Sequence, residues 1–461
     1  MKFITQSFVM MAMLGSSCQS VKHTAPSRVQ IITLDPGHFH AALVQKSMYP
    51  GVDSTVHVYA SAGPDVEQHL ARINAYNSGP QGTHWNEVVY KGNDFLEKMI
   101  ADKKGNVVVI SGNNHRKTEY IKRSIDRGFH VLADKPMVID PASFEVLKKT
   151  FEEASQKNLL LYDIMTERYE ITNMLQKEFS TIPEVFGTLQ KGSPENPAVE
   201  MESVHFFYKY VSGRVLTRPA WFMDISQQGE AIADVATHLV DLVQWECFPA
   251  KSIDYKKDIQ IDSARRWSTD LTLSQFTAVT KEKVFPDYLK KEVARDSVLP
   301  VFANGQINYQ LNGVHVKVIA RWDYQAPEGS GDTHYSKLRG TKANLVIRQG
   351  AEQKFKPTLF IEPVESQDAL YEQQLIQKLK DVQANYPGVE LKKINTGWEV
   401  IIPEKYKDGH EAHFAKVTEK FLGFLKNGDM PAWEVPNMLA KYYTTTQAVE
   451  WARKNQKTNT F

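Results

Sequence analysis

The sequence has few cysteines and no excess of charge of either sign. Only two cysteines, Cys18 and Cys247, occur in 461 residues, which excludes a framework of several disulfides. Lys and Arg number 55 and Asp and Glu number 54, giving a formal net charge of +1. Because no overall field attracts polyanions, we expect no nucleic-acid partner. The length and a hydrophobic fraction of 42% indicate a globular protein of two or three domains.

The start of the chain lacks an apolar run long enough to span a bilayer. A short stretch from about Phe8 to Leu14 follows one Lys and ends in small residues before Cys18, which is typical of an export signal. The ending LGSSC is similar to that of bacterial lipoprotein signals, in which the cysteine carries the lipid. We predict that residues 1–28 are a signal and tether. Secretion without a lipid and a buried N-terminal segment stay open as alternatives, because Gly15 stands where such signals usually have Leu.

The predicted signal also defines where the protein is expected to work. It predicts an exported protein, periplasmic or on the cell surface of a Gram-negative bacterium, whose only contact with the membrane is the lipid on Cys18. If Cys18 is lipidated, Cys247 has no partner within the chain, so no disulfide is expected.

Strand-like and helix-like segments alternate from residue 29 to residue 167. The β-branched run VQIITLD at 29–35 is followed by a turn and a helical segment, and the apolar run VVVIS at 107–111 is followed by helical YIKRSIDRG. Alternation of this length predicts an α/β fold with a parallel, doubly wound sheet, in which ligands bind at the carboxyl ends of the strands. We therefore predict a Rossmann dinucleotide-binding domain over residues 29–167.

The pattern changes after residue 167. Polar and apolar residues alternate in MESVHFFYKYV at 201–211 and in NGQINYQLNGVHVKVIARWDY at 304–324, which is typical of antiparallel strands. Residues 401–461 have a helical pattern. We predict a C-terminal α+β domain over residues 168–461, with an open, mostly antiparallel sheet and a helical tail.

The first strand–helix turn, Asp35 to His40, is poor in glycine. It lies where a dinucleotide fold has G-x-G-x-x-G, but only Gly37 remains, and Asp35 and His40 take the places of the other two glycines. Gly37 would let the backbone approach a pyrophosphate. No acidic residue ends the second strand, where Ser61 stands, so the choice between NAD and NADP is open. An ordinary strand–helix turn is the alternative.

Polar side chains follow two neighbouring strands of the predicted sheet. Asp134, Lys135 and Pro136 come after the apolar strand FHVLA, at the edge where a doubly wound sheet presents catalytic groups. A single Lys at such a place is usually a solvated surface charge. Residues 113–115, Asn-Asn-His, end the preceding strand and would face the same cleft. This pairing of strand ends favours a functional role for Lys135.

Asp234 and His238 are four residues apart in a segment with helical periodicity, GEAIADVATHLVD at 229–241. A carboxylate and an imidazole at this spacing can hold a general base beside a substrate hydroxyl, and a nearby Lys can stabilise the developing alkoxide. A solvated helix face is the alternative interpretation of the same spacing.

These motifs resemble those of the glucose-fructose oxidoreductase, inositol dehydrogenase and MocA family (Gfo/Idh/MocA). DKP at 134–136 resembles the E-K-P motif of that family, and 229–241 resembles its G-x-x-x-D-x-x-x-H-x-x-D helix. The resemblance runs from about Val29 to Arg348 and includes RPAWF at 218–222. It implies a nicotinamide cofactor between the two domains, and a C-terminal sheet that carries the substrate face and often the contact of a homo-oligomer.

The resemblance also implies roles for individual residues. His238 would take the hydroxyl proton, Asp234 would orient it or bind the sugar, and Lys135 would anchor the cofactor and the substrate oxygen. These three form the predicted catalytic set. The predicted cofactor-binding residues are Asp35, Gly37, His38, His40, Ser61, Asn113, Asn114, His115, Asp134, Lys135 and Pro136, the predicted substrate-binding residues are Arg168, Trp221, Asp234 and His238, and no metal site is predicted.

The resemblance and the export signal together define the expected activity. We expect an NAD- or NADP-dependent enzyme that oxidises a secondary hydroxyl of a sugar or glycoside, at C3, and that keeps its cofactor tightly bound because free NAD is scarce outside the cytoplasm. One alternative is an NAD-dependent glycoside hydrolase that works through a transient 3-keto sugar. The other is a sugar-binding lipoprotein that has kept the fold but not the cofactor.

The tail adds a further cluster, His410, Glu411 and His413. Its spacing differs from H-E-x-x-H, so metal ligation is only one of three interpretations. Contact with a sugar cleft or an interface, and capping of a helix start, are the others.

Overall fold

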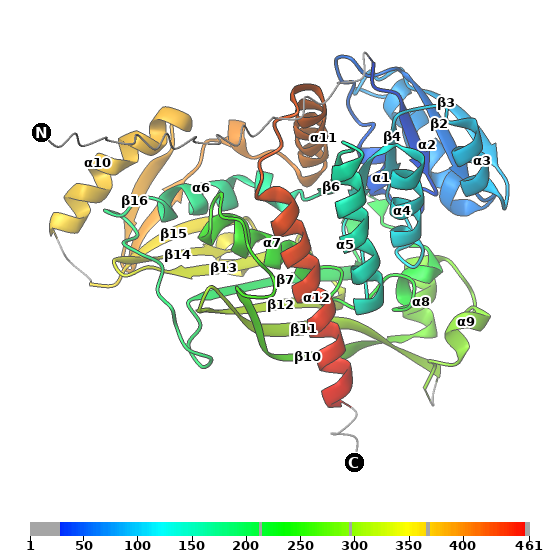
Figure 1. Cartoon of the computed structure of the whole chain (residues 1–461). Helices are drawn as coiled ribbons and strands as arrows, with labels where there is room; N and C mark the ends of the chain where they lie inside the picture. The colour runs from blue at the N-terminus through cyan, green and yellow to red at the C-terminus, as the bar shows by residue number, and fades with distance from the viewer. Residues whose placement is uncertain (1–27, 212–213, 295–296, 366–368, 457–461) are drawn as a thin grey trace, which may run out of the picture.

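The computed structural model describes residues 28–211, 214–294, 297–365 and 369–456. The predicted signal and tether, with Cys18, lie outside these residues. The chain forms two domains with a helical tail that lies along both of them (Figure 1). Within the described part of the chain, no helix combines the length and the apolar character needed to cross a membrane.

The N-terminal domain is built on a six-stranded parallel sheet in the order β3-β2-β1-β4-β5-β6. The order reverses direction between β1 and β4, which is where such sheets bind ligands. The apolar run Val107–Ile110 is fully buried, as expected for a strand covered by helices on both faces. The strands are β1 (Ile31–Leu34), β2 (Thr55–Ala60), β3 (Asn86–Lys91), β4 (Val107–Ile110), β5 (His130–Asp134) and β6 (Leu161–Ile164).

Local sequence signals fix the ends of the connecting helices. Asp140 caps α5 by accepting a hydrogen bond from the Ser143 N–H at 2.9 Å, and Gly128 ends α4 with a φ of 91°. The first helix is only four residues long, because the turn that precedes it extends to Phe39. The helices are α1 (His40–Leu43), α2 (Pro64–Ser78), α3 (Phe95–Asp102), α4 (Lys117–Arg127) and α5 (Pro141–Gln156).

The C-terminal domain contains a nine-stranded sheet in the order β10-β11-β12-β7-β13-β14-β15-β17-β16. Only the β12–β7 pair is parallel among these described strands, so the predicted open, mostly antiparallel sheet is confirmed. A small hairpin of β8 (Tyr210–Val211) and β9 (Arg214–Val215) stands apart from it. The strands are β7 (Val199–Tyr208), β10 (Ile259–Thr272), β11 (Val298–Leu311), β12 (Val314–Gln325), β13 (Thr333–Arg339), β14 (Ala343–Arg348), β15 (Thr358–Pro363), β16 (Glu390–Ile394) and β17 (Gly397–Ile401).

Helices cover one face of this sheet. Contacts join α6 to β14 and β15, α7 to β7 and β12, and α12 to β10. The segment 250–305 forms β10, two short helices and the start of β11. The helices are α6 (Ile171–Ser180), α7 (Ala236–Cys247), α8 (Leu273–Thr280), α9 (Asp287–Lys290), α10 (Ala369–Asn385), α11 (His410–Asn427) and α12 (Glu434–Gln456).

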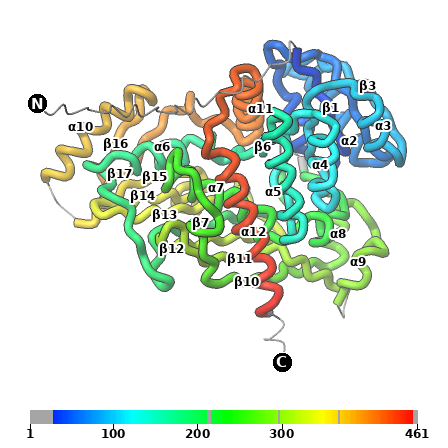
Figure 2. Tube along the Cα trace, in the orientation of Figure 1, coloured from blue at the N-terminus to red at the C-terminus, as the bar shows by residue number. Residues whose placement is uncertain are grey.

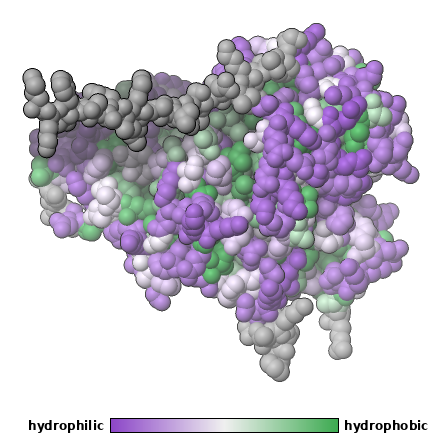
Figure 3. Space-filling view, in the orientation of Figure 1, coloured by the Kyte–Doolittle hydropathy of each residue, from purple (hydrophilic) through white to green (hydrophobic). Residues whose placement is uncertain are grey.

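The helical tail joins the two domains. Phe414 and Phe421 of α11 and Tyr442 of α12 are buried in the core of the N-terminal domain, while Ala448 of α12 belongs to the core of the C-terminal domain. Figure 2 shows the tube of α12 running down across both domains beside α5 and α7. The surface seen in Figure 3 is mainly hydrophilic, with apolar residues scattered over it. The buried apolar side chains of the tail therefore pack into both domains and hold them together.

Candidate functional site

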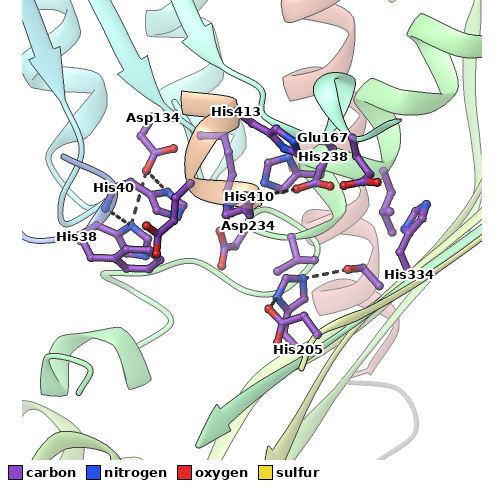
Figure 4. A pocket seen from close by; sticks show the side chains of 18 of the residues that line it. His38, His40, Asp134, Glu167, His205, Asp234, His238, His334, His410 and His413 are labelled. Carbon is purple, nitrogen blue, oxygen red and sulfur yellow. Dashed lines mark hydrogen bonds and ion pairs between the residues drawn. The ribbon is translucent and has the colours of Figure 1, made fainter. Parts of the chain in front are cut away.

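A cavity of about 690 Å³ lies between the two domains. The loop after β4 contributes Asn114, the loop after β5 contributes Lys135, α7 contributes His238, and β7 contributes His205. The first turn of α11 closes the cavity with His410. In Figure 4 the labelled imidazoles and carboxylates come from these separate elements and gather around the same space.

Lys135 and Asp234 form an ion pair in this cavity, across the junction of the domains. Lys135 Nζ lies 2.6 Å from Asp234 Oδ1, and Gln228 donates to Asp234 Oδ2 at 3.0 Å. The two side chains of the pair are 11% and 7% exposed. Burial alone would raise the pKa of Asp234, but Lys135 and Gln228 hold that pKa below its usual value. Asp234 is therefore an anion that fixes the Lys135 ammonium in place.

His238 lies in the first turn of α7 and faces the cavity. Burial, followed by the nearby Lys135, lowers the pKa of His238 to about 3, so its imidazole is neutral at physiological pH. Its Nδ1 is buried and has no hydrogen-bond partner among the described residues. A neutral imidazole with a free nitrogen is suited to accept a proton.

The pairing expected between Asp234 and His238 is not formed. Helix α7 begins at Ala236 rather than near Gly229, so Asp234 lies in the turn before the helix. The Asp234 carboxylate accepts hydrogen bonds from Lys135 and Gln228, and no hydrogen bond joins it to His238 among the described residues. The expectation that Asp234 orients His238 is corrected: it orients Lys135.

The β1–α1 turn keeps one glycine of a dinucleotide turn, Gly37, and a left-handed residue in the place of the first glycine. Asp35, in the place of the first glycine, has a φ of 47°, in the left-handed region, and its carboxylate accepts from the Tyr120 hydroxyl at 2.8 Å. A Cβ added to Gly37 would lie 3.2 Å from the Trp221 ring and 3.0 Å from Asp65 Oδ2. The lack of a side chain at Gly37 thus allows Trp221 and Asp65 to approach the backbone of this turn closely.

Two family models match the chain. The model described as "Oxidoreductase family, NAD-binding Rossmann fold" matches residues 31–162, and that described as "Putative oxidoreductase C terminal domain" matches residues 175–453. A crystal structure of a "putative oxidoreductase" from Parabacteroides merdae is 56% identical with a TM-score of 0.91, and covers 94% of this chain and 99% of its own. The chain belongs to the Gfo/Idh/MocA oxidoreductase family.

More distant structures share the fold of this Gfo/Idh/MocA protein. A levoglucosan dehydrogenase in complex with NADH is 13% identical with a TM-score of 0.58, over 93% of this chain and 97% of its own. GenD2 from gentamicin A biosynthesis, in complex with NAD, is 13% identical with a TM-score of 0.56, over 94% of this chain and 96% of its own. The comparison with curated proteins found no match to the chain. The N-terminal domain is the NAD-binding Rossmann fold of the family.

The cavity fits the nicotinamide end of the family's cofactor. Asn114 Oδ1 is buried without a hydrogen-bond partner in the described chain and lines the cavity beside Lys135, so an acceptor is available for the carboxamide N–H. Asn114 and Lys135 would hold the nicotinamide and its ribose, and the turn at Gly37 would hold the pyrophosphate. At that turn Trp221 Nε1 donates to Asp65 Oδ2 at 2.9 Å, across the two domains.

The predicted site residues fall into two groups. His38, His40, Asn114, Asp134, Lys135, Asp234 and His238 line the cavity together. The side chain of Ser61 is exposed, Asn113 donates to Gln227 Oε1 at 2.7 Å, and His115 Nδ1 lies 3.2 Å from the Ser226 carbonyl. The residues outside the lining of this cavity are Asp35, Gly37, Ser61, Asn113, His115, Pro136, Arg168 and Trp221.

Arg168 has a structural role rather than the substrate-binding role that the resemblance implied. Its Nε and Nη2 donate to Asp241 at 2.6 and 2.7 Å, and its Nη1 lies 3.1 Å from Glu434 Oε2. All three side chains are nearly fully buried. Glu434 belongs to α12, so Arg168 links the start of the C-terminal domain to the tail.

Several cavity residues were missed in the sequence. Lys117 is buried, donates to the Asp134 carbonyl at 3.1 Å, and has its pKa lowered to about 8 by burial. His205 Nδ1 lies 2.8 Å from Asp332 Oδ2, and the Ser203 hydroxyl lies 2.9 Å from His205 Nε2. Ser203 and His205 are two apart on β7 and so share a face, but this alternation indicates only which face is polar.

The tail cluster lies at the cavity as well as at a helix start. His410 is the first residue of α11, and His410, Glu411 and His413 all line the cavity. His410 Nδ1 lies 3.4 Å from Glu167 Oε1, and Glu411 forms an ion pair with Lys46 of the N-terminal domain. This position fits the interpretation that the three residues contact a cleft. They also lie at the start of a helix, as the capping interpretation expects.

Proposed function

We propose that this protein oxidises a secondary hydroxyl of a sugar or glycoside, at C3, with transfer of hydride to an NAD(P) cofactor. One observation carries the proposal: Lys135 from the N-terminal domain, and Asp234 and His238 from the C-terminal domain, meet in one cavity at the carboxyl edge of the Rossmann sheet. The cavity volume of about 690 Å³ lies within the range that small-molecule sites occupy.

The chain supplies the proton chemistry of this reaction. The neutral imidazole of His238 accepts the proton of the hydroxyl group, and the ammonium of Lys135 stabilises the alkoxide that develops on the oxygen. Asp234 holds Lys135 by its 2.6 Å ion pair, so the ammonium is positioned before the substrate arrives. When bound, the nicotinamide supplies the hydride acceptor.

The lining supports a sugar as the substrate. Carboxyl, amide, imidazole and ammonium groups outnumber the apolar side chains, yet the rings of Phe222 and Trp322 also reach the cavity. Sugars present hydroxyls at their rim and C–H groups on their faces, which match such a mixture of polar groups and aromatic rings. Arg218, buried between the two rings, lies 4.6 Å from the Phe222 ring and 4.7 Å from the Trp322 ring and fixes this wall.

The location and assembly belong to the same proposal. We infer that the enzyme is exported as a lipoprotein and keeps its cofactor bound between turnovers. The open face of the nine-stranded sheet, opposite the helices, is proposed as the contact of a homo-oligomer. That face carries Arg265, Trp267 and Arg321 around a shallow depression.

The first experiment measures bound cofactor. The protein is purified without added nucleotide and denatured, and the released NAD(H) and NADP(H) are quantified by mass spectrometry. Near-stoichiometric nucleotide is expected, followed by formation of 3-keto products in a screen of glycosides. Absence of nucleotide, and no binding in a titration with each dinucleotide, would favour the non-catalytic sugar-binding protein.

A glycoside hydrolase working through a transient 3-keto sugar is the second candidate. It is favoured by imidazole–carboxylate pairs that hydride transfer does not use: His205 with Asp332 at 2.8 Å and His410 with Glu167 at 3.4 Å. Such pairs could remove the C2 proton and protonate a leaving group. Release of aglycone with solvent deuterium at C2 would support this candidate, and accumulation of the intact 3-keto glycoside would exclude it.

A further inference from the structure

Two histidines and an aspartate converge beside the β1–α1 turn. His40 Nδ1 lies 2.9 Å from Asp134 Oδ2, and His38 Nδ1 lies 3.8 Å from the same oxygen. One ligand atom from each of the three residues falls within 4.8 Å of the other two. Figure 4 shows both imidazoles directed at the Asp134 carboxylate from the turn below it. We call His38, His40 and Asp134 the turn cluster.

The turn cluster occupies an unusual place for polar side chains. His40 stands where a dinucleotide turn has its third glycine, and the residue is only 8% exposed. The two imidazole rings meet edge to face with their centroids 4.0 Å apart. Burial lowers the pKa of both histidines well below the usual value, so both present neutral rings.

Neighbouring groups hold the carboxylate in position. The Ser111 hydroxyl donates to Asp134 Oδ2 at 2.9 Å, and Lys117 donates to the Asp134 backbone carbonyl at 3.1 Å. Partners of this kind fix the orientation of metal-ligating side chains in proteins. The whole cavity is lined by six carboxyl groups and five cationic side chains, and near the turn cluster the carboxylates of Asp134 and Asp234 offset Lys117 and Lys135.

We propose that the turn cluster binds one divalent transition-metal ion. Two imidazoles and one carboxylate are the ligands that Zn²⁺, Mn²⁺, Fe²⁺ and Co²⁺ share, whereas Mg²⁺ and Ca²⁺ prefer oxygen ligands alone. Tetrahedral metal–ligand bonds of about 2.0–2.2 Å place the ligand atoms about 3.3–3.6 Å apart. The present spread of up to 4.8 Å therefore has to close by about 1.2–1.5 Å, a movement that His38, the more distant ligand, would have to make.

The proposed ion would face the substrate. All three residues of the turn cluster line the cavity next to Lys135, so the remaining coordination positions are open to water or to a pair of neighbouring hydroxyl oxygens of the ligand. This site does not depend on the proposed oxidation. The turn cluster would bind the ion both in a sugar dehydrogenase and in a non-catalytic sugar-binding protein.

Metal content tests the proposal without any substrate. The purified protein is stripped with EDTA, reloaded separately with Zn²⁺, Mn²⁺ and Co²⁺, and desalted, and the bound metal is measured by mass spectrometry. One equivalent per chain is expected for at least one of the ions. His38→Gln and His40→Gln are each expected to weaken binding by at least about tenfold, and Ser111→Ala by about tenfold through the freed carboxylate.

Matched variants separate the turn cluster from other histidines. His84→Gln changes an exposed histidine, and His410→Gln changes one whose ring lies 5.9 Å from that of His40. Both are expected to keep the equivalent of metal. Melting curves of His38→Gln with and without metal check that the fold is kept, and the metal should raise the melting temperature of the unchanged protein only. Stoichiometric binding that survives in both His38→Gln and His40→Gln, or no binding by the unchanged protein, would overturn the proposal.

Discussion

At the scale of single residues, the site depends on the pairing of Lys135 with Asp234. Each side chain comes from a different domain, and each would be an uncompensated charge in the cavity without the other. The pair therefore positions the ammonium for the substrate and also holds the two domains together. Removing either partner is expected to affect activity and stability at once, and a double substitution can separate the two effects.

Lys135→Met should abolish turnover and also lower stability by about 3–5 kcal/mol, because the buried Asp234 loses its cation. The double variant Lys135→Met with Asp234→Asn should regain most of the stability but none of the turnover. Urea unfolding and turnover on a confirmed glycoside measure the two effects. Lys104→Met, at an exposed lysine, is the control. Near-normal turnover of Lys135→Met would remove Lys135 from the mechanism.

His238→Asn should lower the rate by about 10²–10⁴-fold while bound nucleotide is kept. The pKa of about 3 for His238 means that its imidazole is already neutral above pH 3, so it stays competent as a base well into the acid range. The pH profile of kcat/KM should therefore show no loss near pH 6.5 from this group. A loss centred near pH 6.5 that disappears in His238→Asn would contradict the assignment.

At the scale of secondary-structure elements, buried polar groups mark where elements meet. His69 of α2 is 2% exposed, and neither ring nitrogen has a hydrogen-bond partner in the described chain. In α12, Lys441 Nζ lies 2.7 Å from Asp163 of β6 and 2.8 Å from Asp241 of α7. His69 is a buried polar group without a partner in the described chain, whereas Lys441 is a cation shared by two carboxylates. Apolar substitutions at these two positions should therefore have opposite effects on stability.

His69→Leu should make the protein more resistant to acid. Burial lowers the pKa of His69 to about 4, below its usual 6.5, so between these values the unfolded chain binds a proton that the folded protein does not. This group's contribution to stability is therefore lost as pH falls from about 6.5 to about 4, by at most about 3 kcal/mol. Calorimetry at pH 7 and pH 4.5 should show a smaller drop in melting temperature for His69→Leu. An equal drop in both proteins would refute the prediction, and His84→Leu at an exposed position is the control.

Lys441→Met should destabilise the protein by about 3–5 kcal/mol, since two buried carboxylates lose the ammonium between them. Denaturation in urea, followed by fluorescence, measures this loss. Lys454→Met lies in the same helix, but the Lys454 side chain is 72% exposed and pairs with Glu450. That variant should change the free energy of unfolding by less than about 0.5 kcal/mol. Equal effects of both variants would show that α12 is not held by the buried ion pairs.

At the scale of the whole molecule, two sheets contribute to one cavity, and the face of the C-terminal sheet opposite its helices is available for contact with another chain. The open face of the C-terminal sheet includes Trp267, over whose ring Arg265 lies at 5.0 Å, and it faces away from the helices. A broad sheet face of mixed polar and aromatic character is the kind of surface that two copies of a chain can share.

Trp267→Glu should convert the proposed oligomer into a monomer, because a charge on each copy would be buried against its equivalent. Light scattering coupled to size-exclusion chromatography gives the mass directly. Lys104→Glu, at an exposed position of the N-terminal domain, is the control for the change of charge. A monomeric mass for the unchanged protein would remove the proposed interface.

The sequence was sufficient for those features that local patterns encode. The alternation of strands and helices predicts the parallel sheet, and the strand-end position of Lys135 predicts its place at the cavity. Arg168 could not be placed in this way, because its partner Glu434 lies 266 residues further along the chain. His205 was missed because an alternating strand shows which face is polar but not what that face meets. The start of α7 at Ala236 was missed because the helical spacing of 229–241 continues through the turn that precedes it.

The contribution of α11 and α12 to both domains has a consequence for the order of assembly. Residues 410–461 supply three side chains of the site and its support: His410 lines the cavity, Glu434 pairs with Arg168, and Lys441 pairs with Asp163 and Asp241. A chain that ends before α11 would lack one wall of the cavity, and Asp163 would be without its Lys441 partner, while Asp241 would keep Arg168 as its cation. The complete binding site therefore forms only once α11 and α12 pack against both domains.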